Sequence, residues 1–258
     1  MKIVVLVKEV PDTYGDRKIA LETGLVDRTA SERVNDEIGE RAVEAALAVQ
    51  AAVPETTITV ITMGPATAAD SVRKTLAMGA DDAVHILDDG LLGADLTLTA
   101  EVLAAAIRQQ SPDLVVAGNL STDGNGGVMG AMLAELLGFA QATNLATLDV
   151  DGSTVRGTRT VDGGSAVIEA PLPAVVSITE AMPDPRFPSF KGVMAAKKKT
   201  VTTVTAAELD ADLLGERAAR AIVVAAASRP PRGAGVVITD EGEGGKRLAE
   251  FLIERKLA

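Results

Sequence analysis

The chain has 258 residues, with 36 acidic and 25 basic side chains for a formal net charge of −11, and it contains no cysteine. This length suffices for one large hydrophobic core, or for one domain with an appendage. The acidic balance and the scarcity of aromatic rings, with one tyrosine and no tryptophan, argue against a nucleic-acid partner, and the lack of cysteine excludes disulfides, thiolate nucleophiles and cysteine-ligated metals.

The amino terminus predicts neither a signal peptide nor a membrane anchor. The apolar stretch 1–7 is too short for a signal-peptide core, charged residues follow it, and no run of 18 apolar residues occurs in the chain. We therefore expect a cytoplasmic protein without direct membrane insertion. The single histidine, His85, lies in an alternating apolar stretch with no second histidine or cysteine to complete a site, which favours a structural role over a catalytic or metal-binding one.

The first half of the chain alternates between strand and helix patterns. Short apolar runs predict strands at 2–7, 57–62, 83–87 and 113–117. Apolar stripes at helical spacing predict helices at 36–53, 65–78, 95–109 and 128–137. Asn35 is the expected N-cap of the first helix, Pro65 is expected to open the second, and Arg73 and Lys74 are expected to be solvated. This alternation predicts a doubly wound α/β fold with a mostly parallel sheet.

The loop between the fourth strand and the fourth helix is the strongest candidate for a ligand site. Residues 118–127 include four glycines, so the backbone can closely approach a bound group. Open α/β sheets bind ligands at such carboxyl strand ends, and the first amides of the next helix favour phosphate. Ser121 and Thr122 add hydroxyl donors. Because the spacing matches neither a Walker A loop nor GxGxxG, a flexible surface loop is the alternative.

The pattern changes in the second half of the chain to short strands, expected at 147–150, 154–161 and 165–170, and a further apolar strand is expected at 174–178. Asp162 and two following glycines predict a hairpin turn between the second and third of them. A further β-rich excursion is expected earlier, at residues 17–34.

The segment 179–200 combines prolines, which are expected to prevent regular structure, with large apolar and basic side chains. Phe187, Phe190 and Met194 lie there beside several lysines, a pattern that favours a protein-docking loop over a disordered linker. Beyond it, we expect an extended arm that ends in a short amphipathic helix at 246–256. Such a helix is weak alone and is expected to pack on a neighbour.

A set of motifs spread through the chain resembles the β subunit of electron transfer flavoproteins. They are VKEVPD at 7–12, GPA at 64–66, KTLAMGAD at 74–81, the glycine loop at 118–130, VDGG at 161–164, LPAVV at 172–176, PR at 185–186 and MAAKKK at 194–199. The resemblance implies an adenine nucleotide alpha hydrolase-like fold over 1–205 with a partner-recognition loop at 178–200. It also implies that the arm and helix at 206–258 pack on the partner subunit.

The same resemblance implies a heterodimer in which an α subunit holds most of a redox-active FAD. This chain would carry a structural AMP and perform no bond chemistry of its own. Its AMP pocket would be formed by Leu6, Asp36, Glu37, Ile38, Gly39, Met63, Gly118, Asn119, Ser121, Thr122, Asp123, Gly124, Asn125, Gly126, Gly127, Val128 and Met129. Tyr14 and Thr160 would lie near the flavin.

The resemblance further implies a route for electrons. Phe187, Phe190 and Met194 would dock acyl-CoA dehydrogenases or other flavin dehydrogenases, with Phe190 at the position of the usual anchor leucine. Electrons would pass through electron transfer flavoprotein–quinone oxidoreductase to the respiratory chain.

Two departures from the family pattern keep alternatives open. Thr160 stands where many members have a glutamate, and the loop lacks the glutamine that members place after the loop acid. A bifurcating type, with a second FAD in place of AMP, is therefore one alternative. An adenine-nucleotide-binding hydrolase or ligase is the other, although no convincing nucleophile or metal cluster accompanies the loop.

Overall fold

A seven-stranded parallel sheet forms the centre of the computed structural model, which describes residues 1–210, 212–215 and 218–257. The strand order is β14-β7-β6-β1-β8-β13-β9, and every neighbouring pair is parallel. The strands are β1 (Lys2–Leu6), β6 (Thr57–Met63), β7 (Asp82–Ile86), β8 (Leu114–Gly118), β9 (Ala140–Leu145), β13 (Ala174–Ile178) and β14 (Val201–Val204). The predicted mostly parallel sheet is confirmed.

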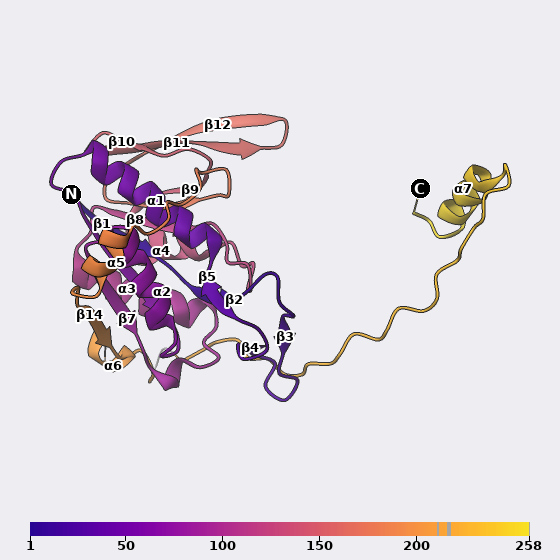
Figure 1. Ribbon diagram of the computed structural model, residues 1–258, viewed down its shortest axis with the longest axis horizontal. Helices are drawn as coiled ribbons and strands as arrows, with labels where there is room; N and C mark the ends of the chain where they lie inside the picture. Colours follow the sequence, from indigo (N-terminus) through magenta and orange to yellow (C-terminus); the bar gives the residue numbers. More distant parts are fainter. Residues whose placement is uncertain (211, 216–217, 258) are drawn as a thin grey trace. The chain divides into compact units, whose positions relative to one another are not determined.

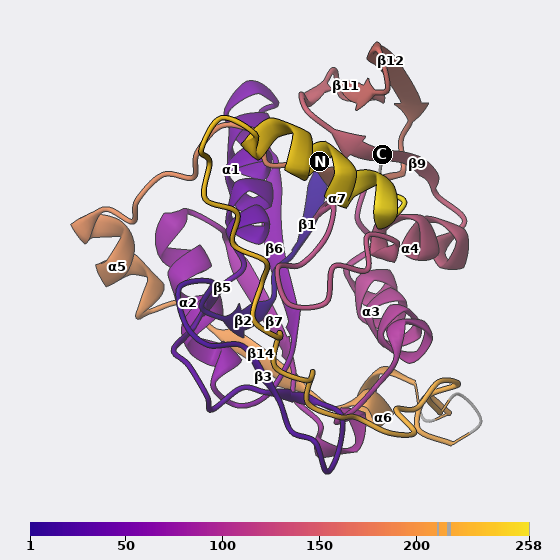
Figure 2. The same ribbon diagram turned by 90° about the vertical axis from the view of Figure 1, so that its right-hand side faces the viewer.

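Helices cover both faces of the sheet (Figures 1 and 2). The helices α1 (Glu37–Ala52) and α2 (Ala68–Met78) pack on one face, and α3 (Leu96–Gln110) and α4 (Met129–Leu137) pack on the other. Successive strand residues point to opposite faces, so in β1 the odd-numbered side chains join the first core and the even-numbered ones the second. The doubly wound arrangement is thus confirmed.

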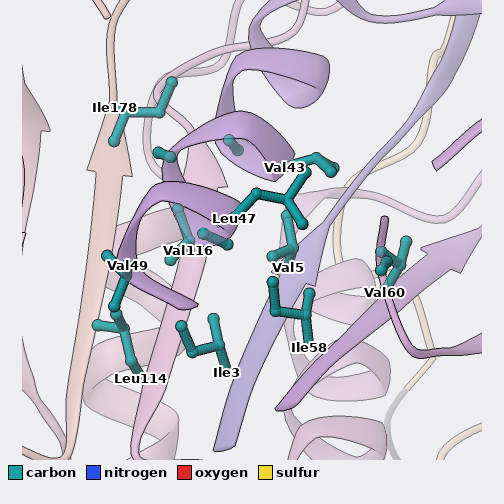
Figure 3. Close-up of a cluster of buried hydrophobic side chains, with 14 of the residues drawn as sticks. Ile3, Val5, Val43, Leu47, Val49, Ile58, Val60, Leu114, Val116 and Ile178 are labelled. Atoms are coloured by element: carbon teal, nitrogen blue, oxygen red, sulfur yellow. The ribbon is translucent and has the colours of Figure 1, made fainter. Parts of the chain in front are cut away.

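The core beneath α1 consists of closely packed aliphatic side chains. In Figure 3, Val43 and Leu47 of α1 lie over Ile3 and Val5 of β1, with Leu114 of β8 beside them. None of the five is more than 5% exposed. Each such side chain contributes about 1.5–3 kcal/mol when it is removed from water, so this layer holds α1 firmly against the sheet.

The first helix begins one residue later than predicted. Asp36, not Asn35, is its N-cap, because Asp36 Oδ1 accepts a hydrogen bond from the backbone N–H of Ile38 at 3.1 Å. Asn35 instead ends the strand β5 (Arg33–Asn35), and its Nδ2 donates to the carbonyl of Ser71 at 3.1 Å. The prediction for Asn35 was wrong because two adjacent residues were both suitable caps.

The start of the second helix also differs. α2 begins after Thr67, and Pro65 lies in the preceding turn, where its carbonyl accepts from the N–H of Ala68 at 2.9 Å. The predicted end before Gly79 is confirmed. α4 ends at Gly138 in the left-handed conformation, with φ 69°, as a glycine after a helix permits.

The predicted hairpin forms a separate three-stranded sheet at the top of Figure 1. It contains β10 (Asp149–Val150), β11 (Thr154–Val161) and β12 (Gly164–Pro171), paired antiparallel. The excursion near the amino terminus is also β-rich: β2 (Glu9–Pro11) pairs with β5, and β3 (Lys18–Ile19) pairs with β4 (Val26–Asp27). Both predictions are confirmed.

Several elements were not predicted from the sequence, among them two strands of the main sheet and the helix α5 (Phe190–Ala196). β9 and β14 form the two edges of the main sheet. Both contain polar residues, so neither has the continuous apolar run that predicts a buried strand. The helix α5 (Phe190–Ala196) contradicts the expectation that the prolines prevent regular structure. Pro188, the last of these prolines, precedes the N-cap Ser189, whose Oγ accepts from the N–H of Gly192 at 3.0 Å, so no proline interrupts the helix.

The chain divides into two compact units, 1–225 and 226–258. The first also contains the one-turn helix η1 (Asp89–Leu91) and α6 (Ala206–Leu209), and both Ala206 and Leu213 are buried in its core. The second contains α7 (Gly244–Glu254), in which no residue is buried. No described helix is long and apolar enough to cross a lipid bilayer.

We predict that Leu114→Ala lowers the free energy of unfolding by about 2–5 kcal/mol, because it leaves a cavity between β8 and α1. Leu92→Ala is the matched control, since Leu92 is 82% exposed and its loss should change stability by less than about 0.5 kcal/mol. Urea denaturation of both variants measures the difference. Equal effects would contradict the packing described for β8.

Candidate functional site

The strand order reverses at the centre of the sheet. β6 and β7 extend the sheet on one side of β1, whereas β8 and β13 extend it on the other. The loops that follow β1 and β8 therefore leave the carboxyl edge on either side of the reversal, where open α/β sheets form a ligand-binding crevice. The glycine-rich loop 119–128 follows β8, so it lies at this switch point.

Two cations hold the loop through Asp123. Its carboxylate is only 3% exposed and lies 2.7 Å from Lys8 Nζ and 3.6 Å from Arg28 Nη2. Burial raises the pKa of Asp123, but the hydrogen bond and charge of Lys8, with hydrogen bonds from Ser121 and Gly124, outweigh burial and hold this pKa below its ordinary value. The ionised carboxylate thus ties the loop after β8 to the segment after β1.

A second carboxylate joins the loop to the start of α1. Asp36 Oδ2 accepts from the backbone N–H of Thr122 at 2.6 Å and from its hydroxyl at 3.0 Å. Gly118 lies directly against Ile38, since a Cβ at Gly118 would come within 2.9 Å of Ile38 Cγ2. The predicted stretches at 36–39 and 118–129 therefore meet in space.

The second half of the loop presents its backbone rather than its side chains. Residues 124–128 are exposed, and α4 begins without a side-chain hydrogen bond to its first amides. Asn125 and Gly127 adopt positive φ values of 49° and 67°, which turn the chain before the helix. Uncapped amides at a helix start, with the helix dipole behind them, attract anions.

The other residues predicted for the nucleotide pocket lie around the same edge. Leu6 and Met63 end the neighbouring strands β1 and β6, and Gly39 is buried in the first turn of α1. Asn119 is half-buried at the start of the loop, whereas Glu37 is exposed. Four stretches far apart in the chain, at 6, 36–39, 63 and 118–129, are thus brought to the carboxyl edge of the sheet.

The two residues predicted near a flavin lie on separate elements. Tyr14 is 97% exposed in the loop after β2. Thr160 is exposed near the tip of the hairpin, opposite Ser165. Each is available for contact with a further molecule.

A polar cavity of about 590 Å³ opens beside the loop. Residues of α2, β2, β5 and the segment before β5 form its walls, among them Glu9, Arg28, Arg33, Asn35, Asp70 and Lys74. Arg28 connects it with the loop, because the same guanidinium pairs with Asp123. None of the residues predicted to bind a nucleotide lines this cavity.

The predicted docking residues display their side chains on the surface. Phe187 and Phe190 are 94% and 84% exposed, and Met194 is 44% exposed. Exposed lysines flank them at Lys191 and at the end of α5. Large apolar side chains among basic ones are typical of a surface that binds another protein.

Comparison with known proteins reveals similarity over nearly the whole chain. A family model described as "Electron transfer flavoprotein domain" matches residues 23–209. A protein named "Electron transfer flavoprotein subunit beta" from Mycobacterium tuberculosis is 46% identical over 99% of this chain and 98% of its own length. Proteins of the same name from Mycobacterium leprae and Megasphaera elsdenii are 47% and 32% identical, over 99% and 100% of this chain and 98% of their own lengths.

The chain belongs to the β-subunit branch of the electron transfer flavoprotein family.

Two of the residues that hold the loop, Lys8 and Arg28, were not predicted from the sequence. Lys8 follows β1 and Asp123 lies in the loop after β8, so opposite charges at two neighbouring carboxyl ends were a usable signal. Arg28 offered no such signal, because it lies in the excursion between β4 and β5, whose path only the tertiary structure defines.

We predict that Asp123→Asn lowers stability at pH 7 and that this difference narrows as the solution is acidified. The folded-state pKa of Asp123 lies below its unfolded value of about 3.9. Its stabilisation is therefore complete above that value and is lost as pH falls through the lower folded-state pKa. Urea denaturation of the wild type and the variant between pH 7 and pH 3 tests this. A difference in the free energy of unfolding that stays constant below pH 4 would contradict the prediction.

Proposed function

We propose that this chain is the β subunit of a heterodimeric electron transfer flavoprotein that accepts electrons from dehydrogenases, such as acyl-CoA dehydrogenases. The electrons are carried by FAD, held mainly by the α subunit, and leave through the flavoprotein–quinone oxidoreductase to the respiratory chain. The observation that carries this proposal is family membership along 99% of the chain. In this proposal the chain acts in the cytoplasm and performs no bond chemistry of its own.

The loop at the switch point is the proposed site of a structural AMP. Its residues fit a phosphate, because the exposed backbone at 124–128 precedes a helix whose first amides have no side-chain cap. Leu6 and Met63 provide apolar surface at the ends of β1 and β6 for the adenine. Asp36 supports the site indirectly, since it holds Thr122 in place.

Exposed side chains outside the glycine-rich loop support the rest of the proposal. Tyr14 and Thr160 would face the flavin of the heterodimer, and their exposure supports contact with another subunit. Because Thr160 is uncharged, this chain would contribute little charge at that position to the flavin environment. Phe187, Phe190 and Met194 would bind the dehydrogenase, and the arm and helix at 206–258 would bind the α subunit.

We predict that the purified heterodimer contains one AMP and one FAD. The chain and its α subunit are expressed together, and the nucleotides are extracted and quantified by chromatography. Two FAD and no AMP would favour the bifurcating type instead. A β chain that stays monomeric and hydrolyses ATP would favour the hydrolase or ligase alternative.

We further predict that Phe190→Ala slows reduction of the flavin by an acyl-CoA dehydrogenase by about tenfold or more, because a central aromatic anchor is lost. The FAD content should not change. Leu92→Ala serves as the control, since it also removes an exposed apolar side chain, outside the docking segment. Loss of FAD together with normal reduction kinetics would count against a docking role for Phe190.

A further inference from the structure

The docking segment, residues 179–200, is attached to α1 through the segment's own amino-terminal end. Arg186 forms two hydrogen bonds of 2.7 Å with the carboxylate of Glu44 in α1. Arg41, from the same helix, donates to the Asp184 carboxylate and to the Met182 carbonyl, both at 2.5 Å. Bidentate pairing between guanidinium and carboxylate fixes direction as well as distance, so the chain that leads to Phe187 leaves α1 in a defined orientation.

The carboxyl-terminal end of the segment is attached to α2. Arg73 is not merely solvated, as the sequence suggested, because its Nη1 donates to the carbonyls of Ala196 and Lys199 at 2.9 and 2.7 Å. Ala196 is the last residue of α5 and Lys199 lies in the turn that follows, so Arg73 ties the end of this helix and its turn to α2. Lys199 in turn donates to the carbonyl of Ala80, just beyond α2, at 2.5 Å.

Between these two ends, α5 lies with its backbone against α2, as Figures 1 and 2 show. The contact is made at Gly192, where a Cβ atom would overlap the carbonyl oxygen of Ala77. Only glycine allows so close an approach. The backbone of the docking segment is thus fixed at its start, its middle and its end.

We propose that the docking segment is a preformed platform for the dehydrogenase, and that Arg73 is a positioning residue that holds α5, the helix that begins with Phe190. The two rings are almost fully exposed, whereas the backbone that carries them is fixed. A partner therefore has to order side chains but not the backbone, which lowers the entropic cost of association. This inference rests on the docking function proposed above.

The surroundings of the rings define the chemistry of the partner surface. Lys191, within α5, and Lys197 and Lys198, just after it, are exposed, whereas Arg186 is already paired with Glu44. The matching surface on the dehydrogenase is an apolar socket bordered by acidic side chains, because it must accept the rings and complement the lysine charges.

The test compares Arg73→Met with Arg108→Met in the assembled heterodimer. Arg108 is a matched control, because its Nη2 donates to the carbonyl of Leu136 at 2.5 Å on the opposite face of the sheet. Arg73→Met should accelerate amide hydrogen exchange in α5 by about tenfold, as expected when two hydrogen bonds are lost. It should also raise the KM for the heterodimer in an acyl-CoA dehydrogenase assay about fivefold with kcat unchanged. Arg108→Met should change neither quantity.

Two further variants separate this inference from the proposed function. Arg73→Lys, which retains a charged donor, should restore part of the exchange protection and of the KM. Phe190→Ala should raise the KM without changing exchange in α5. If Phe190→Ala raises the KM but Arg73→Met does not, the platform proposal is overturned and the docking function stands. If neither variant raises the KM, the docking function fails and this inference fails with it. Unchanged hydrogen exchange in α5 of Arg73→Met would refute the positioning role of Arg73.

Discussion

The structure depends above all on the reversal of strand order between β1 and β8. Both strands are buried, parallel and adjacent, so the segments that follow them leave the sheet at the same edge. Lys8 can therefore donate a hydrogen bond to Asp123, and Asp36 can accept one from Thr122. The candidate nucleotide site is thus a consequence of topology. The side chains then fix the loop in one conformation.

The helix α1 supports both of the regions that we connect with function. Its N-cap, Asp36, holds the glycine-rich loop, and Arg41 and Glu44 hold the start of the docking segment. At a rise of about 1.5 Å per residue, Glu44 lies eight residues beyond Asp36 and about 12 Å from it along one helix. The aliphatic core beneath α1 (Figure 3) therefore sets the geometry of both regions.

The distribution of charge complements this arrangement. The chain carries a net charge of −11, yet cations gather at the two places where the structure uses them. At the loop, Lys8 and Arg28 neutralise the buried carboxylate of Asp123. Along the docking segment, Arg73 and Arg186 are occupied by contacts within the chain, which leaves the exposed lysines to face a partner. Net charge alone indicates neither role, because both depend on local pairing.

The sequence by itself determined the order of the main elements, the hairpin at Asp162 and the position of the glycine-rich loop, because apolar periodicity and turn residues act over short distances. The family motifs also identified its relatives, because each motif is a short run of neighbouring residues. Only the tertiary structure decided which of Asn35 and Asp36 caps α1, that the edge strands β9 and β14 join the sheet, and that Arg73 ties the end of α5 to α2. These outcomes depend on partners distant in the chain, whose positions are set by packing and strand order rather than by the residues nearby.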